Sequence, residues 1–248
     1  MEKVKAKKQY GQNFLKDTTI LDKIIQSMPN NNNYMVEIGP GLGDLTKNLV
    51  KYKDMTAYEV DTDLIGILKS KFAIEIEEEK LKLIHTDVLV AWDKQKTLND
   101  GKYDLIANLP YYIATNMVQK EVAEKFTAKV NDKDYSSLGI ITELISIDSR
   151  ILFDVPPESF DPPPKIISSI LYIKKDIDKY LDKDFNKFLK ACFVQPRKKL
   201  SKNLTSVLSK DAIFEIYKEL NIDDNVRPHE VSSSLYSQMH TRVKDGRN

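Results

Sequence analysis

The chain has 248 residues and a formal net charge of +1 at pH 7, and its 41% hydrophobic and 30% charged residues are typical of a soluble globular protein, not of a disordered one. The single cysteine, Cys192, excludes an intramolecular disulfide, and three scattered histidines show no metal-ligand spacing, so neither redox nor metal chemistry is indicated. No apolar run reaches membrane-spanning length, and the basic N-terminus lacks the apolar core of a secretory signal, so we expect a cytoplasmic protein without a membrane span.

The first two-thirds of the chain alternate short apolar runs with amphipathic stretches. This alternation predicts an α/β fold, in which a parallel sheet is covered by helices. Apolar residues have helical spacing over residues 18–28, 42–50 and 63–72. Strand-like runs occur at residues 34–38, 55–60, 81–86 and 103–109.

The next segment is expected to add one helix and two strands, at residues 138–147, 150–155 and 166–173. Prolines between these two strands mark a loop that continues neither of them. From about Asp176 onward the sequence is rich in lysine, helical in its periodicity and without a convincing strand. We therefore predict a boundary there, between a domain at residues 1–175 and a small helical domain at residues 176–248.

The first strand runs into EIGPGLGDLT, a glycine-rich turn that leads into a helix. Gly39, Gly41 and Gly43 allow a tight turn and the close approach of a ligand to the main chain. Such a turn is also compatible with a purely structural role or with NAD. The alternating glycines and Pro40, however, depart from the usual dinucleotide spacing G-x-G-x-x-G.

Polar side chains also stand at the ends of the next three strands, namely Glu59, Asp87 and Asn108. A carboxylate at Glu59 can accept hydrogen bonds from both hydroxyls of a ribose, and Asp87 can accept one from an adenine amino group. Each acid alone is equally compatible with a turn or a helix cap. Because strand ends border the ligand crevice of an open α/β sheet, the set predicts a binding site at this edge.

Five sequence words occur in the order typical of one family: YGQNFLKD at 10–17, VEIGPGLGDLT at 36–46, NLPYYI at 108–113, VQKEVAEKF at 118–126 and FDPPPKIISS at 160–169. With them the chain resembles the ribosomal RNA adenine dimethyltransferase family, specifically its small-subunit branch. The resemblance implies a Rossmann-like S-adenosylmethionine-dependent methyltransferase sheet at residues 1–175 and a helical RNA-binding domain at residues 176–248. The cofactor-binding residues that it implies are Asn13, Leu15, Gly39, Gly41, Glu59, Asp87 and Asn108.

The same resemblance places the target adenine at Asn108, Leu109, Pro110 and Tyr111. The amine of adenine is a poor nucleophile because its lone pair is delocalised into the ring. Acceptors at the Asn108 side chain and at a main-chain carbonyl near Pro110 would favour a pyramidal nitrogen. Tyr111 offers a stacking face worth roughly 1–3 kcal/mol. Phe160 is the expected second face, or else a core aromatic, and Tyr112 either contacts the substrate or packs beneath the loop.

A basic run in the C-terminal segment FVQPRKKLSKNL supplies the expected RNA contacts Arg197, Lys198, Lys199 and Lys202. Such a run is either a solvated helix face or a grip on the phosphate backbone, in which case binding weakens with salt. Pro196 stands before the run and would start or end a helix there.

The function that these observations predict is N6,N6-dimethylation of two adjacent adenines near the 3′ end of 16S ribosomal RNA, by a monomeric enzyme that acts on the small ribosomal subunit during ribosome biogenesis. One alternative is the related antibiotic-resistance methylase of the large subunit. Another is a ribosome-assembly factor that keeps the fold and binds RNA without catalysis. FDPPPKIISS and the C-terminal segment favour the small-subunit enzyme, and the intact NLPY argues against loss of activity.

One link departs from the family pattern. In the family, a helix and the beginning of a strand separate NLPYYIAT from VQKEVAE, whereas only Asn116 and Met117 do so here. A parallel strand must start at the opposite edge of the sheet, and that crossover normally takes a dozen or more residues. Either the sheet is rearranged beside the site, or further residues of the molecule lie between the two words. We expect the second, because the motifs on both sides are intact.

Overall fold

The computed structural model describes residues 6–7, 12–88, 90–91, 103–107, 117–176, 178–181 and 183–245. The chain divides into two compact units: the first comprises Met1–Lys120 and Ile151–Leu171, and the second comprises Glu121–Arg150 and Tyr172–Asn248. Within the described ranges, no helix is long and apolar enough to cross a membrane.

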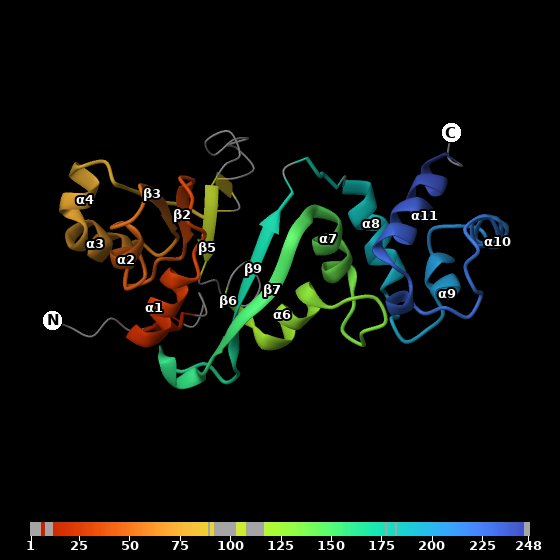
Figure 1. Ribbon diagram of the computed structural model, residues 1–248, viewed down its shortest axis with the longest axis horizontal. Helices are drawn as coiled ribbons and strands as arrows, with labels where there is room; N and C mark the ends of the chain where they lie inside the picture. Colours follow the sequence, from red (N-terminus) through yellow and green to blue (C-terminus); the bar gives the residue numbers. More distant parts are fainter. Residues whose placement is uncertain are drawn as a thin grey trace. The chain divides into compact units, whose positions relative to one another are not determined.

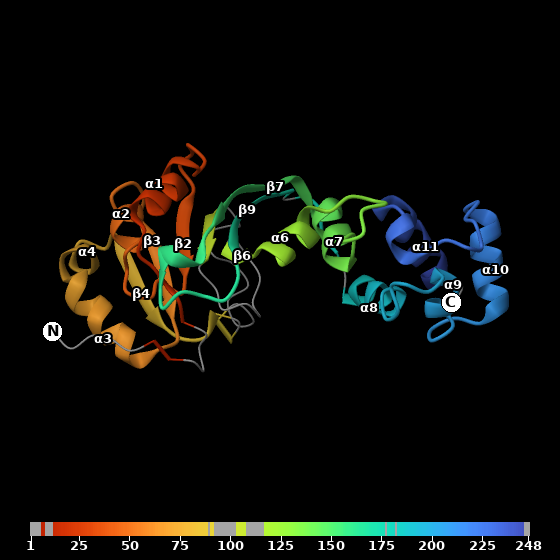
Figure 2. The same ribbon diagram turned by 90° about the horizontal axis from the view of Figure 1, so that it is seen from below.

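The first unit contains a parallel sheet with the strand order β4-β3-β2-β5, in which β5 is labelled in Figure 1 and β4 in Figure 2. Its strands are β2 (Tyr34–Ile38), β3 (Met55–Glu59), β4 (Leu81–His85) and β5 (Tyr103–Ala107). All four agree with the apolar runs of the sequence, and the predicted α/β class is confirmed. Val36 and Ala57, in the two inner strands, are 0% exposed, because a parallel strand inside a sheet is covered on both faces.

Among the described residues of the first unit, helices α1 (Thr18–Gln26), α2 (Thr46–Leu49), α3 (Thr62–Lys71) and α4 (Ala73–Glu77) accompany this sheet (Figures 1 and 2). Helix α1 begins after Asp17, whose side chain caps it by accepting hydrogen bonds from two backbone N–H groups. Helix α2 begins at Thr46 and not at Leu42 as predicted. The reason is the backbone of Gly43, whose φ of 75° lies outside the right-handed helical region.

Two further sheets join segments that are distant in the sequence. Strand β1 (Phe14–Leu15) pairs antiparallel with β8 (Phe160–Asp161), so that the words QNFL and FDPPPK lie side by side. Strand β6 (Met117–Gln119) pairs antiparallel with β9 (Ser168–Lys175), which also pairs with β7 (Ser146–Val155).

In the printed sequence only Asn116 and Met117 join the words NLPYYIAT and VQKEVAE, and the expectation of further residues between them stays a prediction. In the described part of the chain, β5 is the outer strand of its sheet, and β6 belongs to a different sheet. The physical reason is length, because residues 108–116 are too few for a parallel crossover.

The second unit is mostly helical. Its helices are α6 (Lys120–Thr127), α7 (Ser137–Ile145), α8 (Lys183–Cys192), α9 (Leu200–Leu204), α10 (Lys210–Glu219) and α11 (Ser233–Asp245) (Figure 2). Ile140 of α7 is buried in one core with Leu189 of α8 and Tyr236 of α11. Residues 121–150 therefore pack with the C-terminal helices, and the compact unit differs from the predicted division at residue 176. The division into a catalytic and an RNA-binding domain stays a prediction.

A polar cluster fixes the amino-terminal end of β5. The ammonium of Lys53 lies 2.6 Å from a carboxylate oxygen of Asp104 and donates to the amide oxygen of Asn31, also at 2.6 Å. The other Asp104 oxygen accepts hydrogen bonds from the amides of Asn31 and Asn33, at 3.3 and 3.1 Å. Only 11% of the Lys53 side chain and 16% of the Asp104 side chain are exposed. The cluster ties the segments that precede β2 and β3 to β5.

We expect Lys53→Met to destabilise the first unit by about 2–3 kcal/mol, because the carboxylate of Asp104 then loses its cation while it remains largely buried. Urea unfolding followed by circular dichroism measures this change. Lys80→Met is the matched control, since Lys80 pairs with Glu78 at 53% side-chain exposure and such pairs contribute about 0–1 kcal/mol. Equal effects of the two substitutions would contradict the role of the cluster.

Candidate functional site

The carboxyl ends of the four parallel strands meet at one edge of the sheet. The residues paired at this edge are Ile38 with Tyr58 and Ala107, and Glu59 with His85. Gly39 directly follows β2, Glu59 ends β3, and Asp87 follows β4. The register therefore brings all three predicted residues to the same edge, where open α/β sheets bind their ligands.

The predicted base-binding residues Asn108, Leu109, Pro110 and Tyr111 lie outside the described residues. Ala107, the last residue of β5, pairs with Ile38, so the chain leaves β5 at the edge that also carries Gly39. The roles of the four residues stay predictions.

The glycine-rich turn after β2 has a backbone that side chains rarely allow. Gly39, Gly41 and Gly43 have φ values of 68°, 60° and 75°, all in the left-handed region. A Cβ atom on Gly43 would lie 2.5 Å from the ring of Phe72, and one on Gly41 would lie 3.1 Å from the ring of Phe14. Packing and backbone conformation thus both require glycine at these two positions.

Glu59 is held by the backbone around it and is only 5% exposed. One carboxylate oxygen accepts hydrogen bonds from the N–H groups of Val60 and Asp61, each at 2.9 Å; the other accepts a long one, at 3.4 Å, from Gly41. Burial raises the pKa of Glu59, and the three N–H groups oppose the rise without cancelling it. Because an ionised carboxylate has about four acceptor positions, Glu59 retains the capacity to accept from a ligand hydroxyl.

Asp87 is exposed, and its carbonyl accepts a hydrogen bond from the N–H of Ala91 at 3.0 Å. It therefore begins a helical turn, which is the ordinary role of an acid at a strand end, while it stays at the same edge as Glu59. Among the described residues, no cluster of His, Cys, Asp or Glu has the arrangement of a metal site.

Strands β1 and β8 place two of the other predicted residues in contact. Leu15 pairs with Phe160, and each is 6% exposed. The carbonyl of Ser159 accepts a hydrogen bond from the N–H of Lys16 at 2.8 Å, which extends the pairing. Asn13 directly precedes β1 and is partly exposed. Phe160 thus lies among the buried residues, and its role as a stacking face stays a prediction.

The basic residues Arg197, Lys198, Lys199 and Lys202 are all exposed around the start of α9. Pro196 lies between α8 and α9, so no helix runs through it. The buried side chain of Asn203 braces this loop. Its amide oxygen accepts from the N–H of Gln195 at 2.8 Å, and its amide nitrogen donates to the carbonyls of Gln195 and Lys199 at 3.1 and 3.3 Å. RNA contact by the four basic residues stays a prediction.

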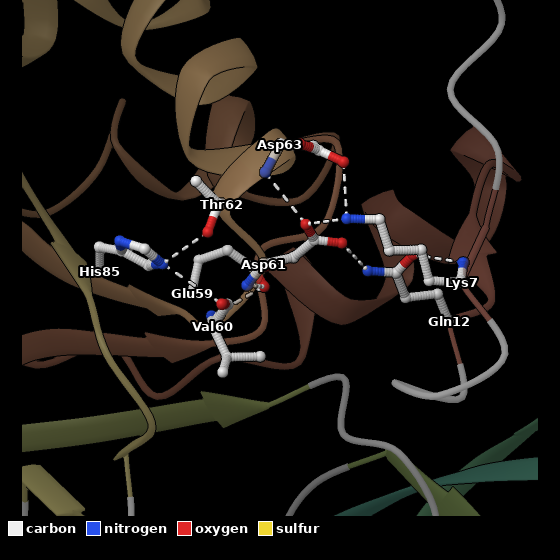
Figure 3. Close-up of polar contacts among 8 residues, drawn as sticks. All are labelled: Lys7, Gln12, Glu59, Val60, Asp61, Thr62, Asp63 and His85. Carbon is white, nitrogen blue, oxygen red and sulfur yellow. Dashed lines mark hydrogen bonds and ion pairs between the residues drawn. The ribbon is translucent and has the colours of Figure 1, made fainter.

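A network missed by sequence reasoning joins the N-terminus to the loop after Glu59 (Figure 3). At its centre, the carboxylate of Asp61 lies 2.6 Å from the ammonium of Lys7 and accepts a hydrogen bond from the amide of Gln12 at 2.8 Å. The sequence held only a local signal, because Asp61 precedes α3 and caps it through the N–H of Asp63. Its pairing with Lys7 is long-range and leaves no pattern in the sequence.

Glu37 is a second residue that sequence reasoning did not single out. It lies in β2, is 2% exposed and accepts a hydrogen bond from the hydroxyl of Thr46 at 2.7 Å. It lines a small cavity under the glycine-rich turn, together with Phe14. Burial raises the pKa of Glu37 to about 7; the hydrogen bond from Thr46 opposes the rise, and the charge of Glu59 adds to it.

Comparison with known families gives one match along nearly the whole chain. Residues 3–245 match the family model described as ribosomal RNA adenine dimethylase. A protein of Aliarcobacter butzleri named ribosomal RNA small subunit methyltransferase A is 81% identical over 264 positions, which cover 100% of both chains. A protein of the same name from Sulfurimonas denitrificans is 49% identical and covers 99% of this chain and 97% of its own.

Two solved structures share the fold. A dimethyladenosine transferase from Plasmodium falciparum superimposes with a TM-score of 0.74 at 22% identity, covering 94% of this chain and 98% of its own. The 23S rRNA methyltransferase ErmE superimposes with a TM-score of 0.63 at 18% identity, covering 94% of this chain and all of its own. At these identities the likeness concerns the fold alone.

We expect the wild-type protein to lose stability as the pH rises towards 7, because buried Glu37 then loses its proton, and we expect Glu37→Gln to abolish this loss. The pKa of Glu37 is about 7 in the folded chain against 4.5 for the free group. The folded state therefore binds the extra proton, so the stabilisation is complete below the lower pKa and is lost as the pH rises through about 7. The loss amounts to at most about 3 kcal/mol, and glutamine keeps an acceptor for Thr46.

Urea unfolding of both proteins at about pH 5 and about pH 8 measures this difference. Glu78→Gln serves as the control, because half of that side chain is exposed. A stability difference between wild type and Glu37→Gln that stays constant with pH would contradict the shifted pKa.

Proposed function

The chain belongs to the ribosomal RNA adenine dimethylase family, and we propose that it dimethylates the N6 amino groups of two adjacent adenines near the 3′ end of small-subunit (16S) ribosomal RNA. The methyl donor is S-adenosylmethionine. The observation that carries the proposal is the joint position of the glycine-rich turn and the buried Glu59 at the carboxyl edge of the parallel sheet.

The family, the Rossmann-like α/β fold, the enzyme class and the cofactor that the sequence predicts are confirmed. The alternative of a large-subunit methylase is not favoured. Relatives with 81% and 49% identity carry a small-subunit name, whereas the 23S enzyme is 18% identical and shares the fold only. A purely RNA-binding factor is not favoured either, because the relatives are named as methyltransferases.

The residues at the strand ends fit the cofactor. Gly39 and Gly41 put no side chain between a ligand and the main chain, and Glu59 keeps acceptor capacity for a ribose hydroxyl. We assign the cofactor contacts to Asn13, Leu15, Gly39, Gly41, Glu59, Asp87 and Asn108. When bound, the cofactor supplies a methyl group on a positively charged sulfur.

The chain's own contribution to the reaction is to hold the adenine amine. In the proposed mechanism, the side-chain carbonyl of Asn108 and a main-chain carbonyl near Pro110 accept hydrogen bonds from the amine hydrogens. The nitrogen lone pair is then localised and aimed at the methyl group. The proton leaves after the nitrogen has become cationic, so alignment matters more than a strong base. Pro110 is proposed to fix the turn after Leu109, and the rings of Tyr111 and Phe160 are proposed to stack on the base.

The RNA grip is assigned to the exposed basic residues around α9, Arg197, Lys198, Lys199 and Lys202. Phosphate contacts of this kind position an RNA without reading its sequence. The enzyme is proposed to act as a monomer in the cytoplasm, where its partner, the small ribosomal subunit, is assembled.

The test of the function is nucleoside mass spectrometry of unmethylated small subunits after incubation with the protein and isotope-labelled S-adenosylmethionine. We expect labelled dimethyladenosine in the small-subunit RNA. The matched variant is Asn108→Ala, which should abolish methylation but retain most RNA affinity, because that affinity comes largely from backbone contacts.

Dimethyladenosine in large-subunit RNA instead would overturn the proposed substrate. Absence of the label from both RNAs would overturn the proposed activity. Wild-type turnover by Asn108→Ala would remove the amine-holding role of that residue.

Reversing the charges of Lys198 and Lys199 should weaken binding to the small subunit and flatten its dependence on salt, because fewer counterions are released per complex. Filter binding at several salt concentrations measures both quantities. The matched control reverses Lys187, which is 79% exposed and lies on α8 outside the basic loop. If the salt slope stays unchanged, the two lysines belong to an ordinary solvated surface.

A further inference from the structure

We infer that Asp61 is a positioning residue for the cofactor site, which ties the N-terminal segment to the loop that carries Glu59. The inference rests on the proposed role of Glu59 in binding the cofactor. Asp61 is assigned no cofactor contact of its own, and it acts through the residues on either side of it.

The carboxylate of Asp61 holds two residues of the N-terminal segment (Figure 3). Its Oδ1 lies 2.6 Å from Nζ of Lys7, and its Oδ2 accepts a hydrogen bond from the amide nitrogen of Gln12 at 2.8 Å. The amide oxygen of Gln12 accepts a hydrogen bond from the backbone N–H of Lys7, also at 2.8 Å. The three residues form a closed ring of contacts. The side chain of Asp61 is 2% exposed and that of Lys7 is 34% exposed, so solvent screens their contact only in part.

The backbone of Asp61 belongs at the same time to the Glu59 site. Its N–H donates to Oε1 of Glu59 at 2.9 Å, and the N–H of Val60 donates to the same oxygen at 2.9 Å. A displacement of Asp61 therefore removes a hydrogen bond from the carboxylate that we assign to the ribose. Figure 3 shows the side chain of Asp61 directed to the N-terminal segment, while its main chain adjoins Glu59.

The N-terminal segment is also connected to the carboxylate of Glu59 through Phe14 and Gly41. Gln12 is followed by Asn13 and then by Phe14, whose ring packs against Gly41. The N–H of Gly41 donates to Oε2 of Glu59 at 3.4 Å. The path from Asp61 through the segment thus ends on the other oxygen of Glu59. This path includes two of the assigned cofactor residues, Asn13 and Gly41.

The charges explain why the tie holds. Burial raises the pKa of Asp61, but the hydrogen bonds from Lys7 and Gln12 outweigh it, so the pKa is lowered and the group is ionised at neutral pH. Hydrogen bonds to Asp61 and Asp63 raise the pKa of Lys7. Removing the lysine leaves a buried carboxylate without its cation, which is strongly unfavourable.

A helix cap is the competing explanation for Asp61. Its Oδ1 accepts from the N–H of Asp63 at 3.0 Å, and its carbonyl accepts from the N–H of Ile65 at 3.1 Å, so it begins α3. Lys7 takes no part in these two bonds. A substitution of Lys7 therefore removes the tie and leaves the cap in place.

The experiment is calorimetric titration of the full chain with S-adenosylmethionine. We expect Lys7→Met to weaken binding roughly 3- to 30-fold, which lies within the range of interaction free energies between contacting residues. Lys7→Arg should restore near wild-type affinity, because it keeps the charge. Asp63→Asn removes the partner of Lys7 that is 70% exposed, and it should leave the affinity within about twofold.

Steady-state kinetics separates positioning from a general loss of structure. Lys7→Met should raise the KM for the cofactor and leave kcat at saturating cofactor unchanged, at a temperature where circular dichroism shows the cofactor-free variant to be folded. Wild-type affinity of Lys7→Met would overturn the inference, and so would a loss that Lys7→Arg fails to restore.

Glu59→Ala distinguishes this failure from a failure of the proposed site. It should weaken cofactor binding by removing charge-assisted hydrogen bonds to the ribose. If Glu59→Ala binds the cofactor more weakly than wild type and Lys7→Met does not, only the positioning role of Asp61 is refuted. If Glu59→Ala binds as tightly as wild type, the assigned cofactor site falls, and the inference falls with it.

Discussion

Backbone hydrogen bonds between parallel strands pair Ile38 with both Tyr58 and Ala107, and the rest of the site depends on this register. A slip by one residue would turn every side chain of a strand to the opposite face of the sheet. Glu59 would then lose the hydrogen bond from Gly41 of the glycine-rich turn, whereas its donors Val60 and Asp61 belong to its own loop. The register is protected by burial, because the inner strands carry apolar side chains with no exposed surface. It is protected at the other end of the sheet by the Lys53–Asp104 pair.

Three buried acids gather near this edge, and each is accommodated in a different way. Glu37 has a pKa near neutrality, so protonation relieves much of its charge. Glu59 keeps its place through three backbone N–H groups. Asp61 is paired with a cation from the N-terminal segment.

The sequence predicted what local patterns control. Strands β2 and β5 were predicted because short apolar runs occur at residues 34–38 and 103–109. The start of α2 was predicted too early, because apolar spacing says nothing about the left-handed backbone of Gly43. The pairing of β1 with β8 and the tie between Lys7 and Asp61 were not predicted, since both join segments that are distant in the chain and neither has a periodicity. Cofactor contacts at strand ends were predictable because topology alone places them.

The proposed site has two parts: the residues around Glu59 and the glycine-rich turn, and the residues that directly follow β5. The relative from Aliarcobacter butzleri aligns over 264 positions that cover both chains completely, 16 more than the 248 residues present here. In this chain, β6 pairs with β9 and does not extend the sheet of β5. The glycine-rich turn follows β2, Glu59 ends β3, and Asp61 is paired with Lys7 of the N-terminal segment; the contacts described above for these residues join β2, β3 and that segment to one another. The proposed amine-holding residues follow β5 directly, at the link itself. Among the assigned cofactor residues, Asn108 alone lies at this link, so the contacts of Glu59 and of the glycine-rich turn form independently of how residues 108–116 are arranged.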